Sequence, residues 1–254
     1  MKKVFNCPMC FKEDNYPLFS FFEDYLINED EAIYECPRKH KFRVVSRNDK
    51  YRILFDTAII QLQDGFSENA ILNAYTSLEE FMKFFILFQL YIKKGNIKEI
   101  LDFLKSISRS ENKKGAFLLS YFELFNENNI GKKIEEFAKL RNSIIHNGYF
   151  VGEQEAYNYC KEMYNFINGI ILNLNKLYKE IDYINMNIEI QRYFKEEEKN
   201  KIPIAEITES IPSILPSIGQ DKIEDFESLY EAFKTTRTYT YENPLKKYCT
   251  KDSK

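Results

Sequence analysis

The 254-residue sequence predicts a mainly α protein, in which a helical bundle follows a small N-terminal module of short strands. Three observations lead to this prediction. Apolar residues recur at alternating spacings of three and four from about residue 51 to residue 177, the period of helices with one buried face. Glycine is scarce, at 8 residues, which argues against a β-barrel with many tight turns. Three of the five cysteines lie within the first 40 residues, so this segment carries chemistry of its own.

The N-terminal segment contains two pairs of residues with metal-ligand spacing. Cys7-Pro-Met-Cys10 is C-x2-C, and Cys36-Pro-Arg-Lys-His40 is C-x3-H. Zinc takes four such ligands in a tetrahedron, and a tight turn presents two of them to one ion. We therefore expect a zinc-ribbon-like module that holds a structural Zn²⁺ through Cys7, Cys10, Cys36 and His40. His40 comes one residue later than the second ligand of a plain C-x2-C pair would. The alternative to a zinc site is that the cysteines are unpaired thiols in a small core.

The residues around these pairs predict short strands and a basic patch. Residues 11–35 have the composition of strands and turns, and the segment from Lys41 to Ser46 begins with the alternation of a half-exposed strand. Cations are dense between residues 38 and 52, where Asp49 is the single acid. Such a patch is able to follow a phosphate backbone, or alternatively to guard a solvated strand edge. The candidate RNA-binding residues are Arg38, Lys39, Lys41, Arg43 and Arg47.

Six helices are predicted between about residues 51 and 177. Gly65 interrupts the first stripe, Ser67 is the predicted N-cap of the second helix, and Asn147-Gly148 ends the fifth. Apolar stripes at helical spacing bury against one another as a bundle. The stripes run over residues 51–62, 71–88, 97–104, 116–125, 134–144 and 156–177.

The chain changes character after about residue 182. Residues 184–200 permit a polar helix, three prolines then interrupt regular structure, residues 221–233 permit one short helix, and the end from Thr235 is predicted to be loose. The predicted parts are a zinc-ribbon-like module over residues 1–48, a helical domain over 49–183 and an unassigned C-terminal extension over 184–254.

Composition and hydropathy exclude several classes of protein. Hydrophobic residues make up 44%, which is normal for a globular chain and excludes wholesale disorder. The formal net charge of -3 excludes a general polycation, so any nucleic-acid site is a local patch. The N-terminus lacks the apolar run of a signal peptide, and the most apolar stretch, residues 81–92, is too short to cross a bilayer. We expect a cytoplasmic protein without membrane contact, in which clustered cysteines bind metal.

A second group of reactive side chains lies at the end of the fifth predicted helix. Arg141, Asn142 and His146 place a cation, an amide and an imidazole within six residues. Five residues advance about 500° along a continuous helix, so Arg141 and His146 would point about 140° apart. They converge only if the helix ends near His146 or if a second copy of the chain faces the first.

This segment resembles the HEPN superfamily of helical ribonucleases and nucleotide-binding domains. The signature of that family is R-x4-6-H with a polar residue directly after the arginine, and Arg141-Asn142-x3-His146 fits it. The helix from Ala70 to about Phe88 and the helix that follows the motif are also similar to those of the family. The resemblance covers about residues 50–180 and implies a HEPN-like helical bundle.

The resemblance implies metal-independent RNA cleavage at a homodimer interface, with Arg141, Asn142 and His146 as catalytic residues and no catalytic cofactor. An imidazole titrates near neutrality and is suited to proton transfer at a ribose 2′-OH or a leaving 5′-oxygen. An arginine is suited to hold the phosphate. Such domains serve as effectors of toxin–antitoxin or antiviral defence systems, which implies an antitoxin or defence partner. One subclass of the family has R-x4-H-x-Y, in which a partner nucleotidyltransferase antitoxin modifies the tyrosine. Here Tyr149 follows His146 with two residues between, one more than in that motif, which argues against this form of regulation.

The alternative function is a non-catalytic adaptor that binds nucleic acid or a partner protein through the zinc ribbon and dimerises through the bundle. Arg141 would then be a surface residue, and His146 would interact with the dipole at a helix C-terminus. Cleavage that survives chelation and disappears when His146 is replaced separates the two functions.

Overall fold

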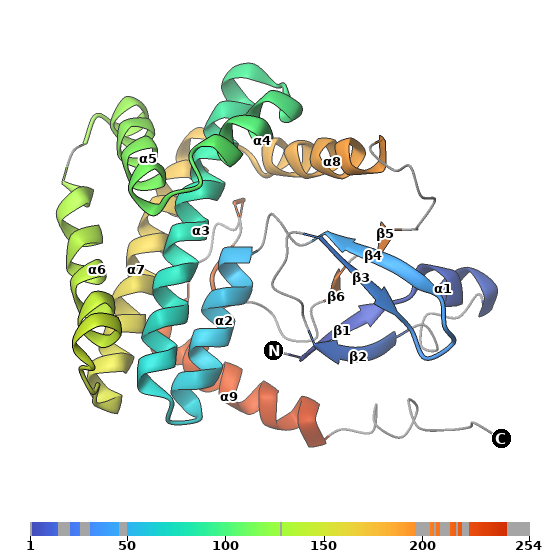
Figure 1. Ribbon diagram of the computed structural model, residues 1–254, viewed down its shortest axis with the longest axis horizontal. Coiled ribbons are helices and arrows are strands. Elements are labelled where there is room, and N and C mark those ends of the chain that lie inside the picture. Colours follow the sequence, from blue (N-terminus) through green and yellow to red (C-terminus); the bar gives the residue numbers. More distant parts are fainter. Residues whose placement is uncertain are drawn as a thin grey trace. The chain divides into compact units, whose positions relative to one another are not determined.

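The described part of the protein is mainly helical, as the sequence predicts (Figure 1). The computed structural model describes residues 2–14, 21–25, 31–45, 50–127, 129–196, 204–205, 207–208, 214–216, 218–219 and 224–242. These residues fall into two compact units. The β unit comprises the described residues of Met1–Arg47, Phe194–Ser213 and Glu231–Lys254, and the helical unit comprises those of Asn48–Tyr193 and Ile214–Tyr230.

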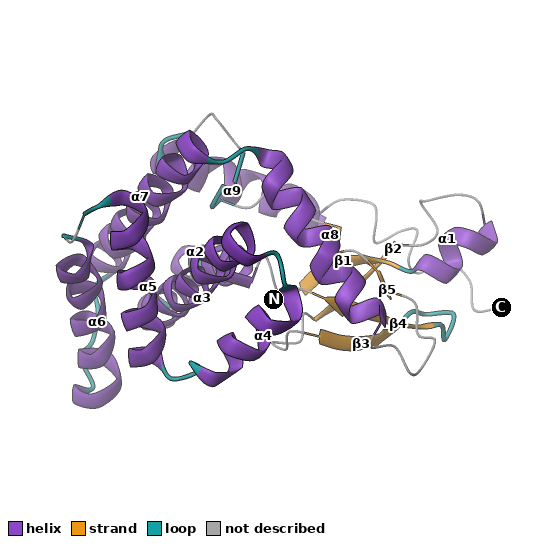
Figure 2. Ribbon diagram, turned by 90° about the horizontal axis from the view of Figure 1, so that it is seen from above, coloured by secondary structure: helices purple, strands orange, loops and turns teal. Residues whose placement is uncertain are grey.

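The helical unit is built around one long helix. This helix, α3 (Ser67–Lys94), packs against several others, and Figure 2 shows it beside α2 in the middle of the unit. The helices that it contacts are α2 (Lys50–Gln63), α4 (Ile97–Ser106), α5 (Ser110–Phe125), α6 (Ile130–Asn147) and α7 (Glu153–Leu177).

Aromatic side chains form much of the core of the helical unit. Phe81, Phe85 and Phe88 of α3 are completely buried, at the positions that the apolar stripe predicts. The ring of Phe85 meets that of Phe117 on α5 edge-on, with centroids 5.0 Å apart. Burying each such ring contributes about 1.5–3 kcal/mol. The stripe therefore accounts for both the helix and the face that it buries.

Helix ends follow the glycine signals, while one predicted cap is wrong. Gly65, Gly95 and Gly148 have φ values of 81°, 70° and 60°, in the left-handed region that ends a helix. Ser67 is the first residue of α3 rather than its N-cap; Phe66 occupies the cap position without a side-chain hydrogen bond. The Ser67 side chain is buried.

The structure extends several helices beyond the predicted ranges, most of all α5, α8 (Glu180–Glu196) and α9 (Phe226–Glu242). Helix α5 begins at Ser110, and helix α8 begins before residue 184. Helix α8 is not wholly polar, because Tyr183, Met186 and Ile190 are buried at helical spacing. Helix α9 continues past residue 235, where a loose end was predicted.

The C-terminal region contributes to the core of the helical unit. Ile214, Leu215 and Ile218 are buried. Polar groups of α2 hold the backbone of this segment: Asp56 Oδ1 accepts from the Ile214 N–H at 3.0 Å, and Arg52 Nε donates to the Leu215 carbonyl at 2.9 Å. The units divide one residue before the first predicted boundary, whereas residues 184–254 form no unit of their own.

The β unit contains two small sheets, each completed by a C-terminal strand. In one sheet the order is β2-β1-β6 and all pairs are antiparallel; in the other the order is β3-β4-β5, with β5 parallel to β4. Helix α1 (Pro8–Asp14) replaces the turns and strands that were predicted from residue 11. The strands are β1 (Lys2–Asn6), β2 (Phe21–Tyr25), β3 (Glu31–Glu35), β4 (Lys41–Val45), β5 (Ile204–Ala205) and β6 (Ile207–Thr208).

We predict that Leu215→Ala lowers the free energy of unfolding by about 2–5 kcal/mol, because the leucine side chain is completely buried and its loss leaves a cavity. Urea denaturation followed by circular dichroism measures the change. The control is Leu177→Ala at the end of α7, where the leucine is 52% exposed. The control is expected to change stability by less than about 0.5 kcal/mol. Equal effects of the two changes would contradict the place of residues 214–219 in the core.

Candidate functional sites

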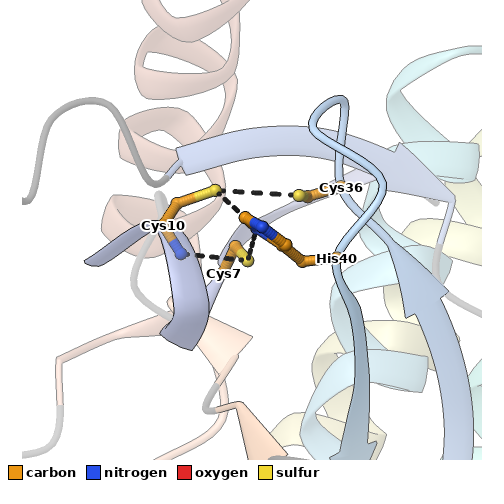
Figure 3. Close-up of side chains that lie close together, drawn as sticks. All are labelled: Cys7, Cys10, Cys36 and His40. Atoms are coloured by element: carbon orange, nitrogen blue, oxygen red, sulfur yellow. Dashed lines mark hydrogen bonds between the residues drawn. The ribbon is translucent and has the colours of Figure 1, made fainter. Parts of the chain in front are cut away.

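The β unit gathers four metal-ligating side chains at one point. The Sγ atoms of Cys7, Cys10 and Cys36 and a ring nitrogen of His40 all lie within 4.8 Å of one another (Figure 3). The three cysteines are buried, and the His40 side chain is 24% exposed. These are the four residues that the spacing predicts as ligands.

The first pair forms because a proline starts a helix directly after β1. Pro8 occupies the first position of α1, where its missing N–H costs nothing. Cys7 precedes the helix in the N-cap position, and its Sγ accepts the Cys10 N–H at 3.5 Å, as an N-cap side chain does. The two sulfurs therefore lie on one side of the turn.

The second pair forms in the turn of the β3–β4 hairpin. Glu35 and Lys41 are partners in the register, so residues 36–40 make the connection. The Cys36 N–H donates to the His40 carbonyl at 3.0 Å, and the Lys39 N–H donates to the Cys36 carbonyl at 2.8 Å. Lys39 takes a φ of 70°, which accommodates the extra residue of the C-x3-H spacing.

The donor distances fit a tetrahedral metal ion. With Zn–S bonds of about 2.3 Å and a Zn–N bond of about 2.0 Å, a tetrahedron has Sγ–Sγ edges of about 3.8 Å and Sγ–N edges of about 3.5 Å. The Cys10 and Cys36 sulfurs are 3.7 Å apart, far beyond a disulfide bond of about 2.05 Å. His40 Nδ1 lies 3.3 Å from the Cys10 sulfur and 3.8 Å from the Cys7 sulfur. The four residues are thus able to bind one metal ion.

The surroundings of this cluster disfavour the thiolate form of Cys10 when no cation is bound. Burial, together with the hydrogen bonds and charges of the neighbouring Cys7 and Cys36, raises the pKa of the Cys10 thiol to about 12. A metal ion supplies the positive charge that stabilises thiolates at neutral pH.

The outer nitrogen of the histidine ring faces a carboxylate that the spacing argument does not identify. His40 Nε2 lies 3.4 Å from Glu13 Oε1, on α1. Glu13 follows Cys10 by three residues, so only knowledge of the helix reveals that the two share a side of α1.

Two of the five candidate RNA-binding residues are engaged by acids in the same unit. Lys39 Nζ lies 3.0 Å from Glu35, and Arg38 Nη1 lies 3.9 Å from Glu13. Lys39 also lowers the pKa of the Glu35 carboxyl through a hydrogen bond and its charge. Lys41 is exposed and Arg43 half-buried, whereas Arg47 lies outside the described residues.

The second candidate site lies on α6 of the helical unit. Arg141 Nη1 donates to Asn142 Oδ1 at 3.0 Å, and the Arg141 guanidinium lies 5.6 Å from the ring centroid of Tyr75 on α3. Tyr75 is mostly buried, so the ring gives the cation a fixed surface. Sequence reasoning missed this role, although Tyr75 lies in the α3 stretch compared with the family.

The side chains of Arg141 and His146 point in different directions from α6. Helix α6 continues to Asn147, so His146 lies in its last turn and its side chain is exposed. The two residues are therefore about 140° apart around the helix axis. The described contacts include no hydrogen bond between Arg141 and His146, so one chain does not bring them together.

The loop after α6 presents apolar side chains beside His146. The Tyr149 N–H donates to the Ser143 carbonyl at 3.2 Å, and the Val151 N–H donates to Glu68 Oε1 at 3.1 Å. Between these two anchors, Phe150 is 89% exposed. The loop thus holds an aromatic ring in solvent.

Comparison of the chain with protein-family models, with curated proteins and with solved structures finds no match. Among the helices that the structure describes, none has the length and apolar character needed to cross a membrane.

We predict that Cys36→Ala prevents stable binding of Zn²⁺, because it removes one of four ligands. Native mass spectrometry after zinc loading is expected to find one ion per chain in the wild type and none in the variant. Cys160→Ala is the matched control: this cysteine is completely buried in α7, and burial raises the pKa of its thiol to about 12. The control is expected to keep the ion, and its loss there would contradict the assignment of ligands.

Proposed function

We propose that the protein is a metal-independent endoribonuclease of the HEPN type, with a structural zinc site in its β unit. The observation that carries the nuclease proposal is the arrangement on α6. Arg141 is held by Asn142 and backed by Tyr75, and an exposed imidazole lies one and a half turns further along the helix. These are the groups that RNA cleavage needs at a phosphate and at a ribose hydroxyl.

The proposed reaction is an intramolecular transesterification of RNA. His146 of one chain takes the proton from the ribose 2′-OH, and the imidazolium of His146 from a second copy of the chain gives a proton to the leaving 5′-oxygen. The 2′-oxygen forms a bond to phosphorus while the bond from phosphorus to the 5′-oxygen breaks, which yields a 2′,3′-cyclic phosphate and a 5′-hydroxyl. Arg141 offsets the charge that develops on the phosphate oxygens, and its contacts with Asn142 and Tyr75 limit the orientations of its guanidinium plane.

The active form is proposed to be a homodimer. Because Arg141 and His146 diverge around α6, residues from two chains are needed to surround one phosphate. Ile145, Tyr149 and Phe150, exposed by 46%, 45% and 89%, adjoin His146 and support a face that a second copy covers. The family resemblance further suggests an effector of a toxin–antitoxin or antiviral defence system, restrained by a partner protein.

The zinc proposal rests on the chemistry of the donors. Three thiols and one imidazole match the ligand preference of Zn²⁺, and four protein ligands leave no position for substrate. The role of the ion is therefore structural. A metal ion would cross-link the turn after β1 and the turn of the β3–β4 hairpin, which stabilises a small module.

The competing function is a non-catalytic adaptor, and the two contacts of Arg141 are consistent with it. Arg141 is already engaged by Asn142 and Tyr75, and a purely structural arginine makes such contacts as well. The two functions differ in whether purified protein cuts RNA.

We predict that the wild type cleaves total RNA or tRNA in the presence of EDTA and leaves cyclic-phosphate ends. His146→Ala and Arg141→Ala are each expected to reduce the rate by at least about 100-fold, the usual contribution of a positioned proton donor or acceptor or of a charge-stabilising group. Lys139→Ala removes an exposed cation two residues from Arg141 on the same helix and is expected to retain full activity. Gel analysis and end-group chemistry measure both the rate and the products.

A wild type that is inert in the tube, and also after expression in cells under the natural trigger, would contradict the nuclease proposal and favour the adaptor. Loss of activity in Lys139→Ala as well would point to general electrostatic binding instead of a specific role for Arg141.

We predict that Phe150→Glu converts the dimer to a monomer and abolishes cleavage, because a carboxylate is costly to bury in an apolar interface. Sedimentation velocity measures the oligomeric state. Leu119→Glu on α5 is the control, since Leu119 is 62% exposed and its replacement leaves the loop after α6 unchanged. If Phe150→Glu remains dimeric and active, the dimer does not use this loop.

A further inference from the structure

The orientation of the His40 ring defines the protonation state that metal binding requires. Its Nδ1 faces the sulfurs of Cys10 and Cys7, at 3.3 Å and 3.8 Å. A neutral imidazole has one N–H and one lone pair, and the metal takes the lone pair. Nδ1 is thus the ligand atom, and the proton must lie on Nε2.

The group that faces Nε2 is the carboxylate of Glu13. The distance from Nε2 to Glu13 Oε1 is 3.4 Å, a few tenths of an ångström longer than a usual N–H···O hydrogen bond of about 3.0 Å. Helix α1 carries both Cys10 and Glu13, three residues apart and therefore on adjoining parts of its surface. The helix that supplies one ligand thus also supplies the acceptor for the imidazole of another.

We propose that Glu13 is a positioning residue of the metal site, which accepts the Nε2–H of His40 and holds the ring in the tautomer that presents Nδ1 to the ion. This inference rests on the zinc proposal above. Metal-bound histidines usually donate their second ring N–H to such an acceptor, which orients the ring and makes the ligand nitrogen more basic. Glu13 belongs neither to the C-x2-C pair nor to the C-x3-H pair, so the spacing of ligands does not reveal it.

Charge balance explains why a carboxylate is tolerated at this place. Three thiolates and one Zn²⁺ already carry a net charge of -1, and a second anion beside them is unfavourable on its own. Arg38 lies in the hairpin turn that also carries Cys36 and His40, and its Nη1 is 3.9 Å from Glu13 Oε2. The Glu13–Arg38 pair adds no net charge, so it is able to orient the ring without repelling the thiolates.

A second carboxylate in the same turn provides the comparison. Glu35 precedes Cys36 and pairs with Lys39 at 3.0 Å. Its side chain is 40% exposed, close to the 48% of Glu13. The two glutamates therefore resemble each other in charge, exposure and proximity to a ligand, and they differ in which one lies opposite the imidazole.

The test is a competition for Zn²⁺ between the full-length protein and a fluorescent chelator of known affinity. Glu13→Ala is expected to weaken zinc binding by about 10- to 100-fold, the usual effect of removing such an acceptor. Glu13→Gln keeps an oxygen that accepts the Nε2–H. Its zinc affinity is expected to lie between those of Glu13→Ala and the wild type. The zinc affinity of Glu35→Ala is expected to stay within about twofold of that of the wild type, because the carboxylate that it removes does not face the His40 ring.

A nitrogen-15 NMR spectrum of the zinc-loaded protein supplies the second readout. The chain has 2 histidines, so His146→Ala assigns the His40 signals. In the wild type the proton is expected on Nε2, and its exchange with water is expected to accelerate in Glu13→Ala and not in Glu35→Ala. A change in the fold alone would not alter this proton selectively.

Three results would overturn the proposal. If Glu13→Ala binds zinc as tightly as the wild type and its Nε2–H exchanges at the same rate, the carboxylate does not position the ring. If Glu35→Ala weakens binding as much as Glu13→Ala, the effect is one of general charge. If the wild type itself binds no zinc, the zinc proposal fails together with this one, which distinguishes that failure from the first two.

Discussion

The burial of α3 is the constraint on which the helical unit depends. This helix has 28 residues, of which 15 are buried. In its C-terminal half five consecutive residues, from Phe84 to Phe88, are buried, so apolar side chains point to every side of the helix. A helix that is apolar all round is stable only when other helices cover it. The surrounding helices are therefore a requirement of the sequence of α3, and α6 is held in place as one of them.

The two units are stabilised in different ways. The helical unit has an extensive core of Phe, Tyr, Ile and Leu side chains, so burial of apolar surface is sufficient to stabilise it. The described part of the β unit buries the stacked pair Tyr34 and Phe42, its three cysteines and Phe233 of α9. A metal ion bound by the cysteines and His40 would cross-link the turn after β1 and the turn after β3, which lie 26 residues apart in the chain.

The two candidate sites also differ in what the fold does for them. In the β unit, short turns bring all four donors to one point within a single chain. On α6, the regular geometry of the helix separates Arg141 from His146, and only Arg141 has firm neighbours in Asn142 and Tyr75. A metal site that is closed within one chain is suited to a structural role. A pair of reactive groups that one chain keeps apart is suited to completion by a second molecule.

The sequence by itself predicted the helices α2 to α7 and the four side chains that could hold a metal ion. Apolar spacing is a local property, so it predicted the stripes of α2 to α7, and Asn147-Gly148 predicted the end of α6. The spacing of Cys7, Cys10, Cys36 and His40 predicted a cluster because each pair lies in one turn. Tertiary structure decided the rest. Ile214, Leu215 and Ile218 lie in a segment that prolines interrupt, and hydrogen bonds with side chains of α2 hold the backbone of its described residues. The contacts of Glu13 with His40 and of Tyr75 with Arg141 join residues that are 27 and 66 positions apart, and no local pattern encodes which distant side chains meet.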